Sequence, residues 1–406
     1  MDHIRLGIAG VGNMGYGHLN SIAEGQCPRI RVVAVSDPCS DMLKRASALC
    51  PEIKTFENTS EMLDSGLIDA VLIAAPHYEH PVIAKESFRR KLHVITEKPA
   101  GVYTRQVREM NEAAAKAGTV FAIMFNQRTN PLFSRAKEIV SSGELGEPKR
   151  LTWIITNWYR TQTYYDSGSW RGTWNGEGGG VLLNQAPHNL DLWQWILGMP
   201  KRIRAFCSVG KYHNISVEDD VTIFGEYEGG ATATFITTTG ETPGTNRLEI
   251  AADRGKLVLE GGLLKWTKLK IPEREFCFTC GSGFASPEAE YEEFSAPEPD
   301  GHPIILNNFA DAILDGTPLI ANGEDGLNSL SISNAAYLSA WTDDWAYIPV
   351  DEELYEMNLN RLRAKEPWVP GDGSPVPGSE EGNEENERNR GTVPRLHGPP
   401  APRTHR

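Results

Sequence analysis

The sequence predicts two successive domains: an α/β domain built on a doubly wound parallel sheet, then an α+β domain with a large, mostly antiparallel open sheet. The first prediction rests on short apolar segments that alternate with helical patterns over residues 1–126, since such alternation is typical of parallel strands joined by helices. The second rests on segments after residue 150 in which apolar and polar residues alternate, as in strands with one open face.

In the first domain, residues 70–75 form a continuous apolar run of the length expected for a strand buried on both faces. Five strands are expected in this domain, at residues 4–9, 31–36, 70–75, 93–96 and 120–125. The helices expected between them run from the turn after residue 9 to about residue 21, and over residues 42–49, 82–90 and 105–117.

The second domain is expected to span residues 127–365 and to begin with a helix at 132–140. Its expected strands lie at residues 151–156, 221–227, 231–236, 247–251 and 256–259, and helices at 307–314 and 326–341 close it. An open sheet face favours a partner, so we expect a homo-oligomer, either a dimer or a tetramer.

A change of composition marks the end of the second domain. Residues 366–406 are rich in Pro, Gly, Glu, Asn and Arg, with very few large apolar residues. Because such a segment buries too little surface to order itself, we expect a disordered tail.

Composition and charge narrow the class of protein. The chain has 406 residues and a formal net charge of −14, which argues against binding to nucleic acid or to acidic lipid. No apolar run approaches the roughly 20 residues of a membrane helix, and no export segment opens the sequence. The six cysteines are dispersed, and Cys277 and Cys280 lack the second pair that a zinc site needs. A reducing cytoplasm is therefore expected.

A glycine-rich turn follows the first predicted strand. Its sequence, Gly10-Val11-Gly12-Asn13-Met14-Gly15, matches G-x-G-x-x-G, precedes a helix, and is followed about twenty residues later by Asp37. In this pattern the glycines permit a tight turn and close approach of backbone N–H groups to a pyrophosphate. An acid at the end of the second strand binds ribose hydroxyls and repels a 2′-phosphate, so we expect NAD rather than NADP. An ordinary glycine turn and a methyltransferase-type nucleotide loop are the alternatives.

The most informative stretch covers residues 178–191. It opens with three glycines, becomes apolar, and places Asn184, His188 and Asp191 at helical spacing, on or near one face. A neutral imidazole is a suitable base near pH 7, and His188 lies beside a glycine-lined opening. We therefore expect His188 to move a proton, with a buried structural histidine as the alternative.

Together with Glu97-Lys98-Pro99, these motifs resemble the glucose–fructose oxidoreductase and inositol dehydrogenase (Gfo/Idh/MocA) family over about residues 3–355. The other matching pieces are Ala75-Pro76 with His80, Asn126-Gln127-Arg128 and Trp170-Arg171. The resemblance implies a Rossmann domain, a second domain whose open sheet packs in oligomers, and oxidation or reduction of a sugar or cyclitol hydroxyl.

The resemblance implies specific catalytic roles. His188 takes the hydroxyl proton while Lys98, turned into the cleft by an expected cis peptide before Pro99, stabilises the reacting oxygen. Many members carry an aspartate where this chain has Asn184, and an amide cannot take a proton, so Asn184 is expected to bind or position the substrate. The asparagine version resembles members that oxidise the C3 hydroxyl of glycosides or of sugar-nucleotide uronates.

Further residues are expected to surround the cofactor and the substrate. The cofactor contacts implied are Gly10, Gly12, Asn13, Met14, Gly15, Asp37, Ala75, Pro76, His77, His80, Glu97, Lys98, Asn126, Trp170 and Arg171. The substrate contacts expected are Lys98, Arg128, Tyr159, Arg160, Tyr165, Asn184 and His188, since aromatic platforms edged by donors suit carbohydrates. The acidic run 218–220 is expected to form a turn or an interface, and no metal site is expected.

The sequence thus predicts an NAD-dependent sugar or glycoside dehydrogenase. A myo-inositol-type dehydrogenase and a glycosidase that recycles NAD through transient oxidation and elimination are alternatives within the enzymes. A non-catalytic sensor of NAD or sugar on the same scaffold is the alternative from another class, although it would not need both Lys98 and His188.

Overall fold

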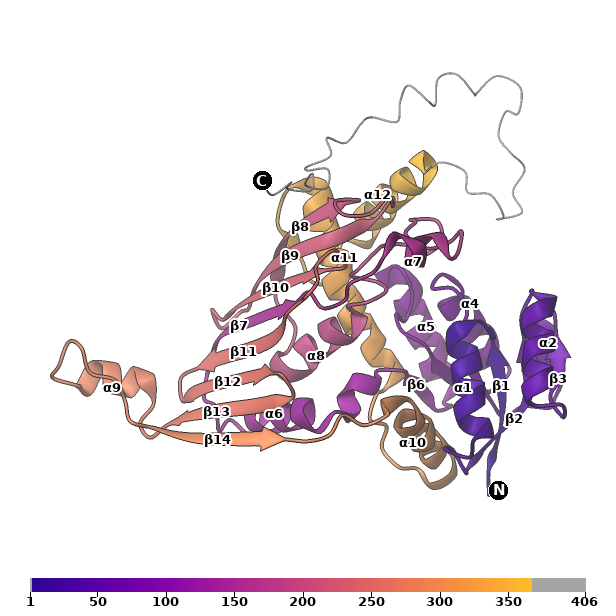
Figure 1. Ribbon diagram of the computed structural model, residues 1–406, viewed down its shortest axis with the longest axis horizontal. Helices are drawn as coiled ribbons and strands as arrows, with labels where there is room; N and C mark the ends of the chain where they lie inside the picture. The colour runs from indigo at the N-terminus through magenta and orange to yellow at the C-terminus, as the bar shows by residue number, and fades with distance from the viewer. Residues whose placement is uncertain (1, 367–406) are drawn as a thin grey trace, which may run out of the picture. The chain divides into compact units, whose positions relative to one another are not determined.

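A computed structural model describes residues 2–366 of the chain, and these residues pack as one unit. The expected tail at 366–406 therefore lies, except for Glu366, outside the described residues. Figure 1 shows a parallel sheet near the N-terminus and a larger sheet beyond it, with helices between the two. Because the described residues form one unit, the domain boundary at residue 126 stays a prediction.

The first sheet has six parallel strands in the order β3-β2-β1-β4-β5-β6. Its strands are β1 (Ile4–Ala9), β2 (Ile30–Ser36), β3 (Lys54–Phe56), β4 (Ala70–Ile73), β5 (His93–Thr96) and β6 (Phe121–Ile123). The helices that connect them are α1 (Asn13–Ala23), α2 (Ser40–Leu49), α3 (Thr59–Asp64), α4 (Glu79–Arg89) and α5 (Thr104–Ala117). The doubly wound parallel sheet is confirmed, and the sequence analysis missed only the short β3 and α3.

The second sheet has nine strands in the order β14-β13-β12-β11-β7-β10-β9-β8-β15. Their bounds are β7 (Pro148–Ile155), β8 (Arg202–Val209), β9 (Glu218–Glu226), β10 (Thr232–Thr238), β11 (Asn246–Ala252), β12 (Gly255–Glu260), β13 (Leu263–Leu269), β14 (Ala289–Ser295) and β15 (Ala346–Tyr347). Its pairings are antiparallel except for β7 with β10. The predicted mostly antiparallel sheet is confirmed.

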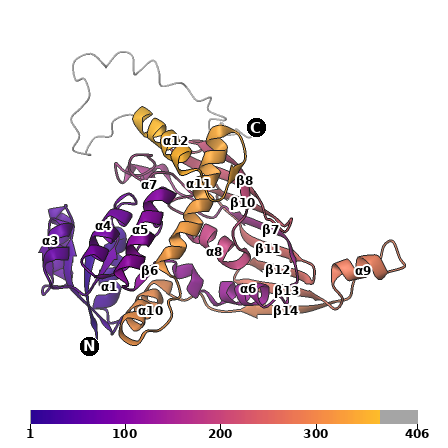
Figure 2. The ribbon, with the colours of Figure 1, turned by 180° about the vertical axis from the view of Figure 1, so that it is seen from behind.

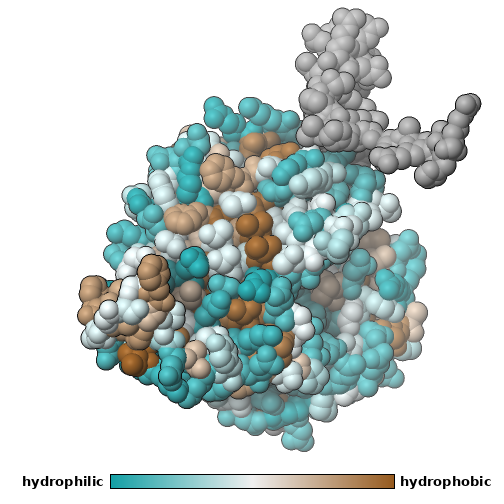
Figure 3. Space-filling view, turned by 60° about the vertical axis from the view of Figure 1, so that its left-hand side comes forward, coloured by the Kyte–Doolittle hydropathy of each residue, from teal (hydrophilic) through white to brown (hydrophobic). Residues whose placement is uncertain are grey.

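Within residues 2–366, helices cover one face of the second sheet and leave the other open, as Figure 2 shows from behind. The remaining helices are α6 (Pro131–Ser141), α7 (Gln162–Asp166), α8 (Pro187–Leu197), α9 (Glu273–Thr279), α10 (Gly301–Asp315), α11 (Gly326–Thr342) and α12 (Glu352–Lys365), with 3₁₀ turns η1 (Asn126–Thr129) and η2 (Gly323–Asp325). The open face exposes Phe206, Phe224 and Tyr347, and Figure 3 shows apolar residues among hydrophilic ones on this side. The expected homo-oligomer stays a prediction.

The segment around Cys277 forms a short helix. Strand-forming residues surround the two cysteines, yet Cys277 lies in helix α9, which has no buried residue. This helix interrupts the connection between β13 and β14 and extends away from the sheet (Figure 1). Without a buried face to favour a strand, local helical hydrogen bonding prevails over β propensity.

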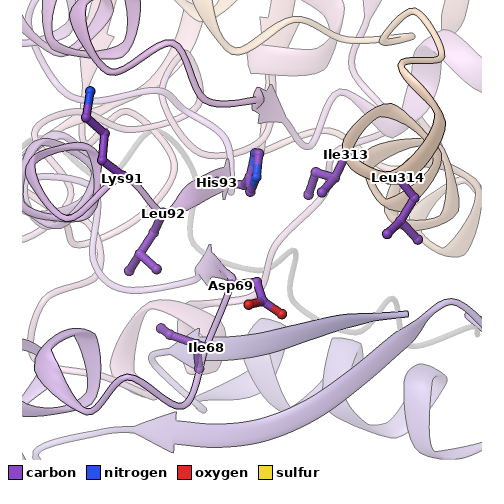
Figure 4. A pocket seen from close by; sticks show the side chains of 7 residues that line it. All are labelled: Ile68, Asp69, Lys91, Leu92, His93, Ile313 and Leu314. Atoms are coloured by element: carbon purple, nitrogen blue, oxygen red, sulfur yellow. The ribbon is translucent and has the colours of Figure 1, made fainter. Parts of the chain in front are cut away.

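Two further features concern the helices and a surface hollow. Among the described residues no helix is both long and apolar enough to cross a bilayer. A hollow lined by residues 68, 69, 91–93, 313 and 314 lies where β4 and β5 begin (Figure 4). Ligands of such sheets bind beyond the carboxyl ends of the strands, so this hollow is at the opposite edge from the expected site.

Close packing at Gly15 provides a test of the glycine turn. A Cβ atom on Gly15 would lie 1.9 Å from the carbonyl oxygen of Gly10, so Gly15→Ala must push α1 away from the turn. We expect a loss of roughly 1–3 kcal/mol in the free energy of unfolding, measured by urea denaturation. Gly17→Ala is the matched control on the same helix, because nothing lies within 4 Å of its Cβ position. There Ala should stabilise by about 0.5–1 kcal/mol, and equal effects at both positions would contradict the packing argument.

Candidate functional site

The glycine turn ends β1 and opens α1 at the carboxyl edge of the parallel sheet. Gly10 has a φ of 88°, and a Cβ there would lie 2.7 Å from the carbonyl oxygen of Ala74. Gly12 faces open space, and no side chain caps α1 there, while Asn13 and Met14 are exposed. The first-turn N–H groups, which no side chain caps at Gly12, are the groups expected to bind an anionic pyrophosphate.

Asp37 lies where expected, just after β2, and it also has a structural role. Its carboxylate accepts hydrogen bonds from the N–H groups of Val11 and Cys39, both at 2.9 Å. These bonds tie the glycine turn to the end of β2. Each carboxylate oxygen keeps a second acceptor position, so the predicted contact with a ribose remains compatible with this geometry.

Lys98 follows β5, and its side chain reaches the glycine-rich segment of the second half of the chain. Its Nζ donates a hydrogen bond of 2.9 Å to the carbonyl oxygen of Asn184, and the Lys98–Pro99 peptide is cis, as predicted. Burial lowers the pKa of Lys98, while the charges of Glu97 and Glu177 oppose that effect. Residues 86 positions apart are thereby joined at one point.

His188 is the second residue of α8, four positions after Asn184. Its ring is 6.3 Å from that of Phe125, edge to face, and its buried Nδ1 has no hydrogen-bond partner among the described residues. Burial, and then the charge of Lys98, lower the pKa of His188 to about 3. The imidazole is therefore neutral at pH 7, and it retains a ring nitrogen that no described residue uses.

Glu177, which the sequence analysis did not single out, lies beneath Asn184. It is 1% exposed, and its Oε1 accepts a hydrogen bond from Nδ2 of Asn184. Its Oε2 accepts from the N–H of Gly172 at 2.7 Å. The available sequence signal for Glu177 was an acid directly before three glycines. This pattern is common in ordinary loops, so it did not single out the residue.

Glu97 is buried, and both of its carboxylate oxygens are hydrogen-bonded. Its Oε1 lies 2.7 Å from Nε2 of His18 on α1, and its Oε2 accepts the N–H of Lys98 at 3.2 Å. Although burial favours the acid form, the hydrogen bond from His18 holds the pKa of Glu97 below its usual value. The His18 ring packs against that of His302, whose Nδ1 is 3.4 Å from Nδ2 of Asn126, and Oδ1 of Asn126 is buried without a partner among the described residues.

Residues after β4 line the same edge of the sheet. His80 on α4 bridges two carbonyl oxygens, with Nδ1 2.8 Å from Pro99 and Nε2 2.7 Å from Ala75. His77, after Pro76, donates from Nδ1 to the carbonyl oxygen of Glu177 at 2.9 Å. Burial lowers the pKa of both histidines. The two rings tie the β4 loop to the loops of Lys98 and Glu177.

Residues 158–174 are rich in aromatic and arginine side chains, some of them buried and others exposed. The Trp170 ring lies 6.1 Å from His77, and the Arg171 guanidinium lies over the rings of Trp170 and Tyr164, at 4.6 and 4.4 Å from their centres. Tyr159 is 44% exposed, and Arg160 donates to its carbonyl oxygen at 2.9 Å. Tyr164 and Arg171 contact the site through Asn184 and Glu177, whereas contact of Trp170, Tyr159 and Arg160 with a substrate stays a prediction.

Tyr165 does not fit its expected place in the substrate pocket. It is 5% exposed, its hydroxyl bonds Thr239 at 2.8 Å, and its ring packs on that of His213 with centres 4.8 Å apart. His213 lies between Asp219 and the carbonyl oxygen of Arg160, at 2.9 Å from each. Tyr165 therefore packs the base of the loop.

Arg128 also differs from its expected role of bridging cofactor and substrate. It is 4% exposed, and its guanidinium binds Asp191 through Nε and Nη2 at 2.8 and 2.6 Å. Nη1 binds Asp325 at 2.7 Å. A guanidinium engaged by two carboxylates anchors α8, and Asp191 faces this ion pair rather than the site of His188.

The acidic run 218–220 was expected to form a turn or an interface, but it begins strand β9, where Glu218 holds the glycine segment in place. Glu218 is fully buried and accepts the N–H groups of Gly180 and Leu182 at 2.9 and 3.0 Å. The hydroxyl of Tyr337 donates to it at 2.7 Å. Within residues 2–366 no group of three or more potential ligands is placed to hold a metal ion.

Comparisons with known proteins agree with this architecture. The family described as "Oxidoreductase family, NAD-binding Rossmann fold" matches residues 4–125, and "GFO/IDH/MocA C-terminal domain" matches residues 133–258. The rhizopine catabolism protein MocA of Rhizobium meliloti is 25% identical over 347 residues, covering 83% of this chain and 95% of that protein. The myo-inositol 2-dehydrogenase of Thermotoga maritima is 23% identical over 338 residues, covering 82% and 95%.

A solved structure extends the similarity. The WlbA dehydrogenase from Bordetella pertussis, in complex with NADH and UDP-GlcNAcA, is 25% identical, with a TM-score of 0.72. The match covers 86% of this chain and 100% of that chain.

A substitution of Arg128 distinguishes a structural role from a role in substrate binding. Arg128→Met would leave Asp191, which is 1% exposed, without its cation, so we expect a loss of about 3–5 kcal/mol in the free energy of unfolding. Arg89→Met is the control, because the Arg89–Glu86 pair lies at the surface and such pairs contribute about 0–1 kcal/mol. Urea denaturation measures both variants. Unchanged stability of Arg128→Met together with a raised KM for substrate would restore the substrate role.

Proposed function

Since the chain belongs to the Gfo/Idh/MocA family of NAD-binding oxidoreductases, we propose that it oxidises a ring hydroxyl of a sugar or glycoside with NAD as hydride acceptor. In this proposal His188 takes the hydroxyl proton and Lys98 stabilises the oxygen. The C3 hydroxyl is the proposed position of oxidation.

The observation that carries this proposal is the hydrogen bond from Nζ of Lys98 to the carbonyl oxygen of Asn184. It holds the ammonium group four residues before His188, and Lys98 is the largest charge influence on that imidazole. An alcohol between the two would meet a donor to its oxygen and an acceptor for its proton. Such an arrangement lowers the barrier by positioning and by electrostatic stabilisation.

The residues divide the chemistry as follows. The bound nicotinamide supplies the acceptor for hydride, and the glycine turn, Asp37 and Asn126 are the groups proposed to hold the dinucleotide. Lys98 donates a hydrogen bond to the substrate oxygen and stabilises its developing negative charge. His188, neutral at pH 7, accepts the hydroxyl proton. Asp37 beside the turn favours NAD over NADP by repelling a 2′-phosphate.

The substrate class has two supports. We propose that Trp170, Tyr159 and Arg160 line the substrate, because aromatic faces and donors suit the apolar and polar sides of a sugar ring. Similar proteins include a dehydrogenase solved with UDP-GlcNAcA. A cyclitol is the second candidate, favoured by the similar myo-inositol 2-dehydrogenase.

A spectrophotometric screen tests the function. Purified protein is incubated with NAD or NADP against cyclitols, free hexoses, glycosides and sugar-nucleotide uronates, and absorbance of the reduced cofactor is followed. We expect turnover with NAD and a sugar derivative, and weaker turnover with NADP. Release of aglycone would instead indicate an eliminating glycosidase, and NAD binding without any turnover would indicate a sensor.

Substitution of the two proposed catalytic groups tests their roles. Lys98→Ala and His188→Ala should each lower kcat by roughly 10²–10⁴-fold, the range of a general acid–base contribution, because each removes one group from the reacting hydroxyl. NAD affinity, measured by calorimetry, should change little. Lys201→Ala is the control, since Lys201 pairs with Glu228 at the surface. A near-normal rate for His188→Ala at neutral pH would show that another group is the base.

A further inference from the structure

The carboxylate of Glu177 is held in the site with only donors around it. Asn184 and Gly172 each donate to one of its oxygens, and Nη1 of Arg171 lies 3.9 Å from Oε1. Burial raises the pKa of Glu177, while the Gly172 and Asn184 bonds and the charges of Arg171 and Lys98 oppose this. Each carboxylate oxygen thus accepts a hydrogen bond, and a cationic side chain lies nearby; such contacts favour the charged form and oppose the effect of burial.

The backbone around Glu177 leaves it little freedom. Its carbonyl oxygen accepts the hydrogen bond from His77. A Cβ on Gly176 would lie 2.2 Å from the carbonyl oxygen of Trp170, and one on Gly178 would lie 2.3 Å from Cγ1 of Val102. The neighbouring glycines therefore allow the loop to pack tightly and to fix the carboxylate under Asn184.

This contact determines the orientation of the Asn184 amide. Nδ2 donates to Glu177 and, at 3.3 Å, to the hydroxyl of Tyr164. These bonds leave Oδ1 as the open end of the amide, which is an acceptor only. The backbone carbonyl of the same residue accepts from Lys98, so Asn184 connects the carboxylate to the lysine.

Glu177 also contributes to the charge balance at Lys98. Burial and the guanidinium groups of Arg160 and Arg171 lower the pKa of Lys98, whereas Glu97 and Glu177 raise it. The other titratable groups that feel the Lys98 charge are His77, His80, His188 and His302. Glu97 is already hydrogen-bonded to His18, so the charge of Glu177 is the second of two that favour the ammonium form.

We infer that Glu177 is a positioning residue for the reaction proposed above: its carboxylate turns Oδ1 of Asn184 toward a substrate hydroxyl and places a negative charge next to the residue that binds the Lys98 ammonium group. The inference rests on the proposed function. Residue 184 is an amide and carries no charge. The inference therefore assigns the negative charge beside the reacting groups to Glu177, in the glycine loop.

A structural role alone would have different consequences. Glu366 offers the comparison, because its carboxylate accepts the N–H groups of Trp174 and Asn175 in the same loop. No contact links Glu366 to Asn184 or to Lys98 among the bonds of these groups. A substitution of Glu366 should therefore only loosen the loop that contains Trp174 and Asn175. A substitution of Glu177 should loosen the same loop and also remove the negative charge near Lys98.

The test compares Glu177→Gln with Glu366→Gln in the full chain, by the pH dependence of kcat/KM. Without the Glu177 charge the neutral amine of Lys98 is favoured, so the loss of activity at high pH should begin about one pH unit lower. The new side-chain amide also has an NH2 group, which cannot accept the hydrogen bond from Nδ2 of Asn184. Asn184 is then held less firmly, so KM should rise. Glu366→Gln should leave the alkaline limb where the unmodified protein has it.

An exchange variant separates charge from fit. Glu177→Gln combined with Asn184→Asp moves the carboxylate to residue 184 and restores an amide-to-carboxylate hydrogen bond. The alkaline limb should return toward that of the unmodified protein. Glu177→Asp keeps the charge on a shorter side chain, so it should leave the alkaline limb of kcat/KM unchanged and raise KM. This variant replaces Glu177→Gln in the comparison if the latter fails to fold.

A second readout does not depend on turnover. Competitive acetylation with acetic anhydride over a pH series, followed by mass spectrometry of the Lys98 peptide, measures the pKa of Lys98 directly. A lower pKa in Glu177→Gln supports the inference, and an unchanged pKa with an unchanged alkaline limb overturns it. If the unmodified protein oxidises no substrate, the proposed function fails, whereas the labelling result still decides whether Glu177 acts on Lys98.

Discussion

One hydrogen bond, from the Lys98 ammonium to the carbonyl oxygen of Asn184, joins the two parts of the site. Lys98 follows a strand of the parallel sheet, and Asn184 precedes the helix that begins at Pro187. Without this bond the lysine would have a buried charge with no fixed acceptor, which is costly in a low-dielectric environment. The bond also places the lysine in the turn that leads to His188.

The groups around this bond make the buried charge tolerable. Glu97 is held by His18 on one side, and Glu177 is held by Gly172 and Asn184 on the other. Two carboxylates thus offset a lysine and the nearby guanidinium groups, and each carboxylate is itself hydrogen-bonded. Satisfied networks of this kind hold side chains in one geometry, which is the condition for catalysis by positioning.

The sequence was sufficient for the features that depend on local pattern. The apolar runs predicted the parallel strands, and the glycine turn with its following helix was recognised from spacing alone, since both follow from short-range backbone requirements. Features that depend on distant side chains were not predicted. Arg128 and Asp191 are 63 positions apart. Their ion pair, and with it the role of Arg128 in anchoring a helix, is therefore visible only in the three-dimensional structure. Glu177 precedes the glycines directly, yet its role depends on where the loop folds over Asn184.

The most direct test of cooperation between Lys98 and His188 is a double-mutant cycle on kcat/KM, using Lys98→Ala, His188→Ala and the double variant. Groups that act on one hydroxyl in one transition state show strongly non-additive effects. We therefore expect the double variant to be only slightly slower than the slower single variant. Losses that multiply, with the double variant slower by the product of the two single effects, would show that the two residues act independently and would contradict a shared site.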